Sequence, residues 1–131
     1  MNRTPAGLSP LLRRILVADA AFEVVVALLL SGVVGNPAFW LNVTGGIIAA
    51  AAAVFAGVGV VLLGAAMYRR TNERFVRTLA FANVAGGAAV WLVAALRWSQ
   101  FESEGHWVVA FIANGCLALG VLEYLALRQE H

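Results

Sequence analysis

Five polar residues interrupt or border the long apolar runs of this sequence, and they are its candidates for chemistry. Asp19 and Glu23 are four residues apart, so they share one face if their segment is helical. A charge at the centre of a bilayer costs roughly 2.5–3.5 kcal/mol on insertion scales, so such residues rarely occur there without a role. The five residues of this predicted intramembrane polar network are Asp19, Glu23, Arg77, Asn83 and Glu123.

The polar network has three interpretations. In the structural one, Arg77 pairs with Asp19 or Glu123 and Asn83 bridges two helices, which fixes the helix register without further function. In the functional one, Glu23 is the deepest carboxyl group and exchanges a proton or a cation for a ligand. In the third, the network contacts a lipid headgroup or a partner at the inner leaflet.

The composition assigns the elements that carry these residues to a membrane. Hydrophobic residues make up 62% of the 131 positions and charged residues 12%, against about 25% charged in soluble domains. Four apolar runs approach or exceed the roughly 20 residues that span a bilayer. We predict an all-α, four-helix transmembrane bundle of up-down-up-down order. It forms a single domain over residues 1–131, with helices at about 10–34, 39–69, 72–98 and 104–128.

The distribution of arginines predicts the orientation. Positive residues concentrate on the cytoplasmic side of membrane proteins, and Arg97 alone lies on the opposite side from the other arginines. Both termini are therefore expected inside, in a multi-pass protein. The arginines on the predicted inner side are Arg3, Arg13, Arg14, Arg69, Arg70, Arg74, Arg77 and Arg128.

Small residues repeat at helical spacing and predict close helix contacts. Helices in lipid pack through small side chains because lipid provides little hydrophobic driving force between them. We expect ordinary packing within the bundle, with the seam of a homo-oligomer as the alternative. The predicted packing positions are Gly45, Ala49, Ala53, Gly57, Gly86 and Gly120.

Two spacings also indicate an internal repeat. Arg13 to Asp19 has the spacing of Arg77 to Asn83, and the second and fourth helices both begin with Trp followed by Asn and Gly. Duplication of a two-helix hairpin explains both observations. Because a hairpin crosses the membrane twice, the repeats would be parallel.

The sequence lacks the residues that several classes of enzyme or cofactor chemistry require. There is no Lys for a Schiff base, and no His lies in a predicted span to ligate haem. Glu102, Glu104 and His106 are too few for a metal site on a short loop. We therefore expect no conventional enzyme, no metal, no cofactor and no nucleic-acid partner.

Three motifs carry a resemblance to known proteins. Arg13-x5-Asp19, Arg77-x5-Asn83 and the run from Glu123 to Arg128 resemble a group of short, uncharacterised four-helix bacterial membrane proteins. This resemblance implies a bacterial inner-membrane location and no assigned activity. Locally, the run from Ala21 to Val24 is similar to the first helix of the small multidrug resistance transporters, which carries an essential Glu.

The functional expectation follows from the polar network. The first hypothesis is an accessory or ligand-binding membrane subunit without catalysis. The alternative is a small proton-coupled transporter or channel that uses Glu23. The expected partners are the lipid bilayer and either further copies of the chain or a larger membrane complex.

Overall fold

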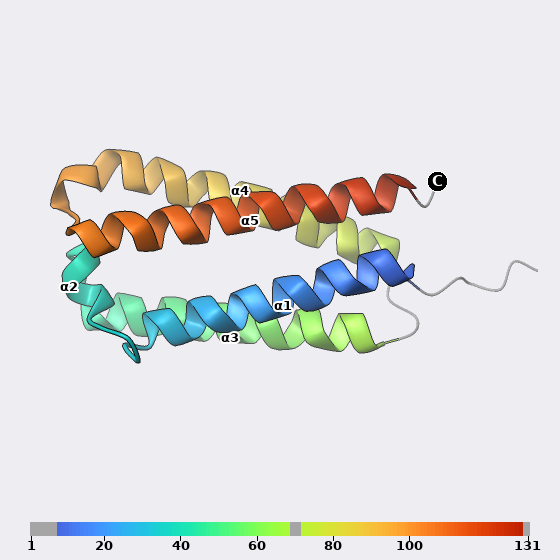
Figure 1. Cartoon of the computed structure of the whole chain (residues 1–131), viewed down its shortest axis with the longest axis horizontal. Helices are drawn as coiled ribbons and strands as arrows, with labels where there is room; N and C mark the ends of the chain where they lie inside the picture. The colour runs from blue at the N-terminus through green and yellow to red at the C-terminus, as the bar shows by residue number, and fades with distance from the viewer. Residues whose placement is uncertain (1–7, 69–71, 130–131) are drawn as a thin grey trace, which may run out of the picture.

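The structure is a computed structural model, which describes residues 8–68 and 72–129. Over these residues the chain is all-helical, which confirms the predicted class, and it contains no strand. Four long helices lie along the longest axis of the molecule (Figure 1). The elements are α1 (Pro10–Leu30), the short α2 (Pro37–Leu41), α3 (Gly45–Met67), α4 (Glu73–Arg97), the 3-10 turn η1 (Trp98–Gln100) and α5 (Ser103–Gln129).

Side-chain caps set the start of the long helices. The Ser9 hydroxyl accepts the backbone N–H of Leu12 at 3.2 Å, and Pro10 occupies the first turn of α1. The Asn72 side chain accepts the backbone N–H of Arg74 at 2.9 Å at the start of α4. These residues satisfy N–H groups that have no partner inside a helix, so the local sequence fixes where each helix begins.

The structure shifts two of the predicted helix boundaries. The first helix ends at Leu30 rather than near 34, because the chain turns through Gly32, whose φ of 89° suits glycine. The predicted helix at 39–69 is broken. Asn42 adopts the left-handed conformation (φ 53°) and ends α2, after which Thr44 caps α3.

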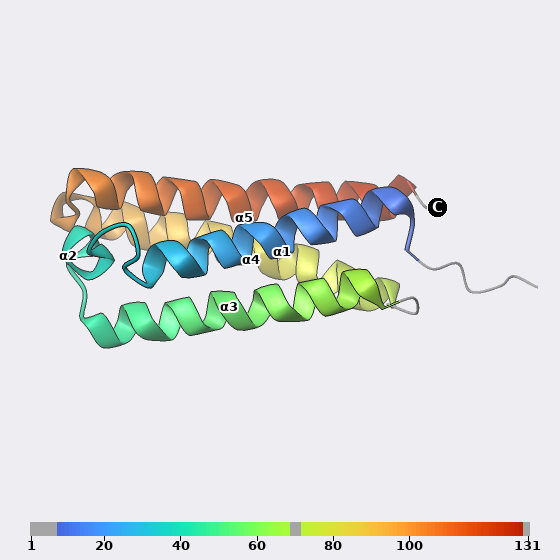
Figure 2. The same cartoon turned by 60° about the horizontal axis from the view of Figure 1, so that its bottom comes forward.

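The four long helices form two hairpins. Antiparallel α1 and α3 pack along each other, and so do α4 and α5, while α1 against α5 is the main contact between the hairpins. By contrast α3 and α4 make almost no close backbone contact, and Figures 1 and 2 show them apart over most of their length. The start of α1 and the end of α5 lie at the same end of the molecule (Figure 1).

The buried core consists of two apolar clusters along the helix axes. Between them lie the buried carboxyl groups of α1 and α5, so the polar residues sit inside the bundle rather than at its ends. The first cluster comprises Leu12, Leu16, Ala20, Leu62, Ala66, Val76, Ala126 and Leu127. The second comprises Val26, Leu30, Ile48, Val108, Ile112 and Cys116.

The outer surface of the long helices is apolar. Leu96 is 75% exposed and Leu92 is 63% exposed, as are many other large apolar side chains. Within residues 8–68 and 72–129, three helical segments are long and apolar enough to cross a membrane: Gly45–Met67, Glu73–Gln100 and Ser103–Gln129. Helix α1 has 21 residues but carries four ionisable side chains, so composition alone does not select it. These features are consistent with a membrane protein.

Candidate functional site

The candidate site is a buried carboxyl cluster formed by Asp19, Glu23, Asn83 and Glu123. Asp19 and Glu23 lie one turn apart on α1 and face the bundle interior. Asn83 comes from the middle of α4, and Glu123 comes from the C-terminal half of α5. Three helices from both hairpins therefore supply the cluster.

Asn83 connects the two hairpins. Its Nδ2 donates to Oδ2 of Asp19 at 2.7 Å and also lies 3.4 Å from each carboxyl oxygen of Glu123. The amide nitrogen carries two hydrogens, so it can donate one hydrogen bond to each carboxyl group. The short distance marks the Asp19 contact as the stronger hydrogen bond.

The three carboxyl groups are buried, and two of their oxygens have no partner. Asp19 and Glu123 are 0% exposed and Glu23 is 2% exposed. Oδ1 of Asp19 and Oε2 of Glu23 make no hydrogen bond with the described residues. Buried polar atoms are normally satisfied, so these two oxygens are acceptors for a donor or a positive charge.

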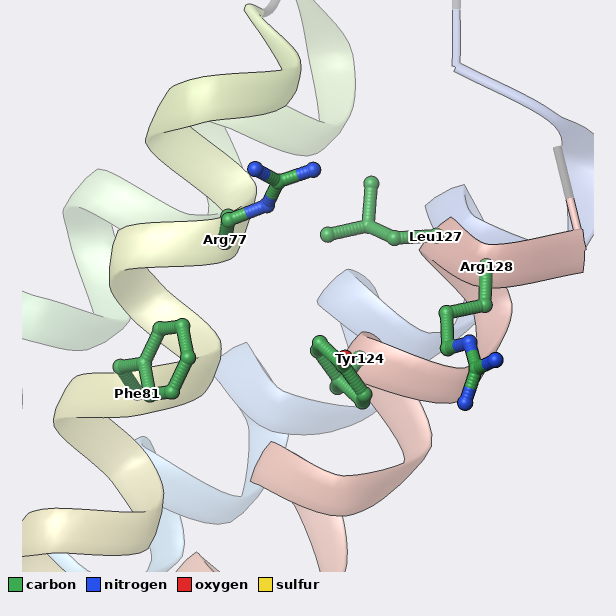
Figure 3. A pocket seen from close by; sticks show the side chains of 5 residues that line it. All are labelled: Arg77, Phe81, Tyr124, Leu127 and Arg128. Carbon is green, nitrogen blue, oxygen red and sulfur yellow. The ribbon is translucent and has the colours of Figure 1, made fainter. Parts of the chain in front are cut away.

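The structure places Arg77 outside the carboxyl cluster, which corrects the predicted pairing with Asp19 or Glu123. Nη2 of Arg77 lies 3.3 Å from Oε1 of Glu73, one turn earlier on α4, and the Arg77 side chain is 54% exposed. Arg77 precedes Asn83 by six positions, about 9 Å along the helix at 1.5 Å per residue. In Figure 3 its guanidinium points toward Leu127 of α5.

A cavity of about 220 Å³ adjoins the cluster where α3 and α4 separate. Glu23, Asn83 and Cys116 provide its polar lining, and apolar side chains of α3 and α4 provide most of the rest. Its volume is several times the roughly 30 Å³ that one water molecule occupies in the liquid. Cys116 of α5 therefore also borders the site.

The packing glycines differ from those that the sequence suggests. Gly45, Gly57 and Gly86 have open space where a side chain would project, and Ala49 and Ala53 are exposed. Of the six predicted positions, only Gly120 lies in a tight contact, because an added Cβ would stand 2.8 Å from the carbonyl oxygen of Ala80. Further tight contacts between helices lie at Gly87, Gly105 and Gly115, with a looser one at Gly59, and the four-residue spacing overlooks all of them.

The two hairpins repeat one contact. A Cβ on Gly59 of α3 would meet the carbonyl oxygen of Ala20, the Cβ of Glu23 and a methyl group of Val24. A Cβ on Gly120 of α5 would meet the same atoms of Ala80, Asn83 and Val84 on α4. Glu23 thus corresponds to Asn83, whereas the sequence spacing paired Asp19 with Asn83.

The buried positions of α3 and α5 repeat as well. Each buried residue of α3 has a buried counterpart on α5 at one constant shift along the sequence, so Glu123 stands where the first hairpin has an apolar core residue. The pairs are Ile48 with Val109, Gly59 with Gly120, Leu62 with Glu123, Ala65 with Ala126 and Ala66 with Leu127.

The opposite end of the molecule carries an aromatic stack rather than a polar site. The ring of His106 lies 4.0 Å from that of Trp98, and His106 Nε2 is 2.8 Å from the carbonyl oxygen of Trp98. Arg97 donates to the carbonyl oxygen of Asn42 and to Gln100. Among the residues that the structure covers, no three His, Cys, Asp or Glu side chains are grouped to hold a metal ion.

No family model, curated protein or solved structure matches this chain. The resemblances drawn from short motifs therefore stay predictions. The chemistry of the buried carboxyl cluster is the basis on which function is inferred.

Proposed function

We propose that this chain is an integral membrane protein of four spans that binds a cation at its buried carboxyl cluster and carries out no conventional catalysis. One observation supports the proposal above all. The buried carboxyl groups of Asp19 and Glu123 meet at Asn83, and that of Glu23 lies one turn from Asp19 on α1. No basic side chain of residues 8–68 or 72–129 pairs with these three groups. The cluster therefore has acceptors in excess of donors.

The electrostatics of the cluster favours uptake of positive charge. Moving a carboxylate into a low-dielectric interior costs several kcal/mol unless a partner compensates it. Asn83 supplies hydrogen bonds but no charge, and like charges a few ångströms apart raise the cost further. In the ligand-free protein, the cluster is expected to hold at least one proton.

The geometry favours a proton or an organic ammonium ion as the bound cation. The two oxygens without a hydrogen-bond partner belong to Asp19 and Glu23 on one helix. Because both lie on the same helix, they suit a cation that donates hydrogen bonds better than a metal ion that must be surrounded from several sides. The adjoining cavity is mostly apolar and opens between α3 and α4. A ligand with a cationic head and an apolar body complements both features.

The location follows from the surface and the arginines. The apolar exterior suits lipid, and burial of Asp19 and Glu23 against other helices makes α1 acceptable as a fourth span. We place both termini on the cytoplasmic side of a bacterial inner membrane. In this setting the protein acts as an accessory or ligand-binding subunit, alone or in a larger complex.

A proton-coupled transporter is the second candidate. Glu23 favours it, because this buried carboxyl has an unpartnered oxygen and also lines the cavity. Competition between a proton and a cation for one carboxyl group is the minimum that coupled exchange requires. Transport would add a change in which side of the membrane the cavity faces.

The proposal is tested by proton release on binding. The purified protein in lipid nanodiscs is titrated with an alkylammonium ion while a pH indicator follows the weakly buffered solution. We expect protons to be released as the ammonium binds, and Glu23→Gln to reduce both binding and release. Glu104→Gln is the matched control, because it removes the same charge from an exposed site at the other end of the molecule.

Two outcomes of the titration decide between the hypotheses. Equal binding by the wild type and by Glu23→Gln would refute a cation site at this carboxyl. If binding depends on Glu23, uptake into proteoliposomes under a pH gradient separates the candidates. A transporter accumulates the ammonium ion and the variant does not, whereas a binding subunit shows no accumulation in either form.

The repeated hairpin contact supports the proposed duplication. Gly59 and Gly120 make equivalent contacts, and the buried positions of α3 recur on α5. A parallel repeat of this kind has its axis along the membrane normal. The polar residues depart from the repeat at Glu123, where Leu62 is the counterpart, and at Asp19, where Leu79 is, so the cluster does not share the repeat of the packing.

A further inference from the structure

A second cavity lies at the arginine-rich end of the molecule, between α4 and α5. Its volume is about 340 Å³, and it is separate from the carboxyl cluster. The residues that line it are Arg77, Phe81, Tyr124, Leu127 and Arg128. In Figure 3 Arg77 projects from α4 toward Leu127, while Arg128 lies beside Tyr124 on α5.

The floor of this cavity is apolar and faces the side of the bundle. The rings of Phe81 and Tyr124 are tilted against each other with centroids 6.2 Å apart. Phe81 is 62% exposed and Tyr124 is 41% exposed. The cavity is therefore open on the lateral surface, where lipid would be the neighbour.

Both guanidinium groups at the cavity are available to a ligand. Among the described residues, Arg77 pairs with Glu73 on its own helix, and exposed pairs of this kind are weak. Arg128 makes no hydrogen bond or ion pair with the described residues. Two cations thus border a hollow whose described lining residues include no acidic side chain.

We propose that this cavity binds an anionic phospholipid, with its headgroup lying between Arg77 and Arg128 and its glycerol and upper acyl segments over Phe81 and Tyr124. Guanidinium groups suit phosphate because they offer several donors in one plane. Basic hollows between helices on the cytoplasmic side are suited to anionic headgroups. The proposal rests on the membrane location proposed above.

The test measures retention of phosphatidylglycerol. The protein is extracted in mild detergent from vesicles that contain equal amounts of phosphatidylglycerol and phosphatidylcholine, and bound lipid is counted by native mass spectrometry. We expect the wild type to retain phosphatidylglycerol selectively. The double variant Arg77→Gln/Arg128→Gln should bind it roughly tenfold to thirtyfold more weakly, at about 1 kcal/mol per arginine.

A matched double variant separates the site from general attraction. Arg13→Gln/Arg14→Gln removes the same charge at the same end, from a different hollow on α1. This control should change the selective retention of phosphatidylglycerol by no more than about twofold, because it removes no direct contact with the lipid in the proposed site. Equal losses in the two double variants would overturn the proposal, and so would a lack of loss in Arg77→Gln/Arg128→Gln.

A competition with inorganic phosphate shows whether the ligand is a lipid headgroup or a free anion. The need for detergent shows whether a negative result refutes the lipid site or the membrane location. Complete displacement of the lipid by millimolar inorganic phosphate would show that the ligand is a free anion, against the proposal. A protein that needs detergent but shows no preference between the lipids would refute only the lipid site. A protein that stays monomeric in water without detergent would refute the membrane location itself.

Discussion

Asn83 holds the carboxyl cluster together at the residue scale. Its amide nitrogen donates to Asp19 of one hairpin and lies within hydrogen-bond distance of Glu123 of the other. The loss of such a donor leaves buried acceptors unsatisfied, which costs more than the hydrogen bonds themselves contribute. The cluster is therefore expected to depend on this one side chain for its geometry.

We expect Asn83→Ala to lower the free energy of unfolding by about 1–3 kcal/mol, because it leaves the Asp19 and Glu123 carboxyl groups without a donor. Thermal unfolding of the protein in detergent measures the loss. Asn114→Ala is the control, since Asn114 makes a single neutral hydrogen bond to Trp91, and such bonds in membrane helices average about 0.6 kcal/mol. Equal losses in the two variants would show that Asn83 does not organise the cluster.

The residues of the cluster were within reach of the sequence, but the position of Arg77 was not. Buried acids in apolar runs are conspicuous, and the four-residue spacing places Asp19 and Glu23 on one face. Arg77 is close enough along α4 to suggest a counter-charge, yet Glu73 stands one turn away and needs no desolvation. Pairing with an exposed carboxylate costs less free energy than moving the Arg77 guanidinium from water into the interior of the bundle.

The two hairpins are the units of packing at the element scale, and one glycine sits at the centre of each. Gly120 allows α5 to approach the backbone of α4 at Ala80, directly beside Asn83. Gly59 plays the same part between α3 and α1. The hairpin contact and the cluster geometry are therefore linked through the turns that carry Glu23 and Asn83.

Gly120→Ala is expected to destabilise the protein by about 1–3 kcal/mol, because the added methyl group overlaps backbone and side-chain atoms of α4. Gly86→Ala, where the space is open, should be neutral or more stable by up to about 1 kcal/mol from helix propensity. Unfolding of both variants in detergent tests this difference. Similar stabilities would mean that α4 and α5 do not approach closely at Gly120.

The all-helical class was predictable from the sequence, whereas the short helix α2 and the packed faces were not. Hydrophobic periodicity reports which face is buried only when water covers the other face. On α3 both faces are apolar, so the regular stripe from Gly45 to Gly57 looked like an interface although it is exposed. The break at Asn42 was also hidden, because a left-handed residue leaves no mark in hydropathy.

The topology can be tested at the scale of the whole molecule. The described ends of the chain lie at one end of the bundle, where most arginines gather. In a Cys116→Ala background, Gln129→Cys should react with an impermeant thiol reagent only from the cytoplasmic side, and Gln100→Cys only from the outside. Both positions are exposed. Labelling of both from the same side would contradict the single crossing by α5 that separates η1 from the described end of the chain.

Infrared spectroscopy of the ligand-free protein in lipid at neutral pH can show whether the buried carboxyl cluster holds a proton. We expect a carbonyl band of protonated carboxylic acid that shifts in D2O. This band should weaken in Asp19→Asn, Glu23→Gln or Glu123→Gln and persist in Glu104→Gln. A spectrum that contains ionised carboxylates alone would contradict the account, because the cluster would then hold three negative charges without a compensating cation.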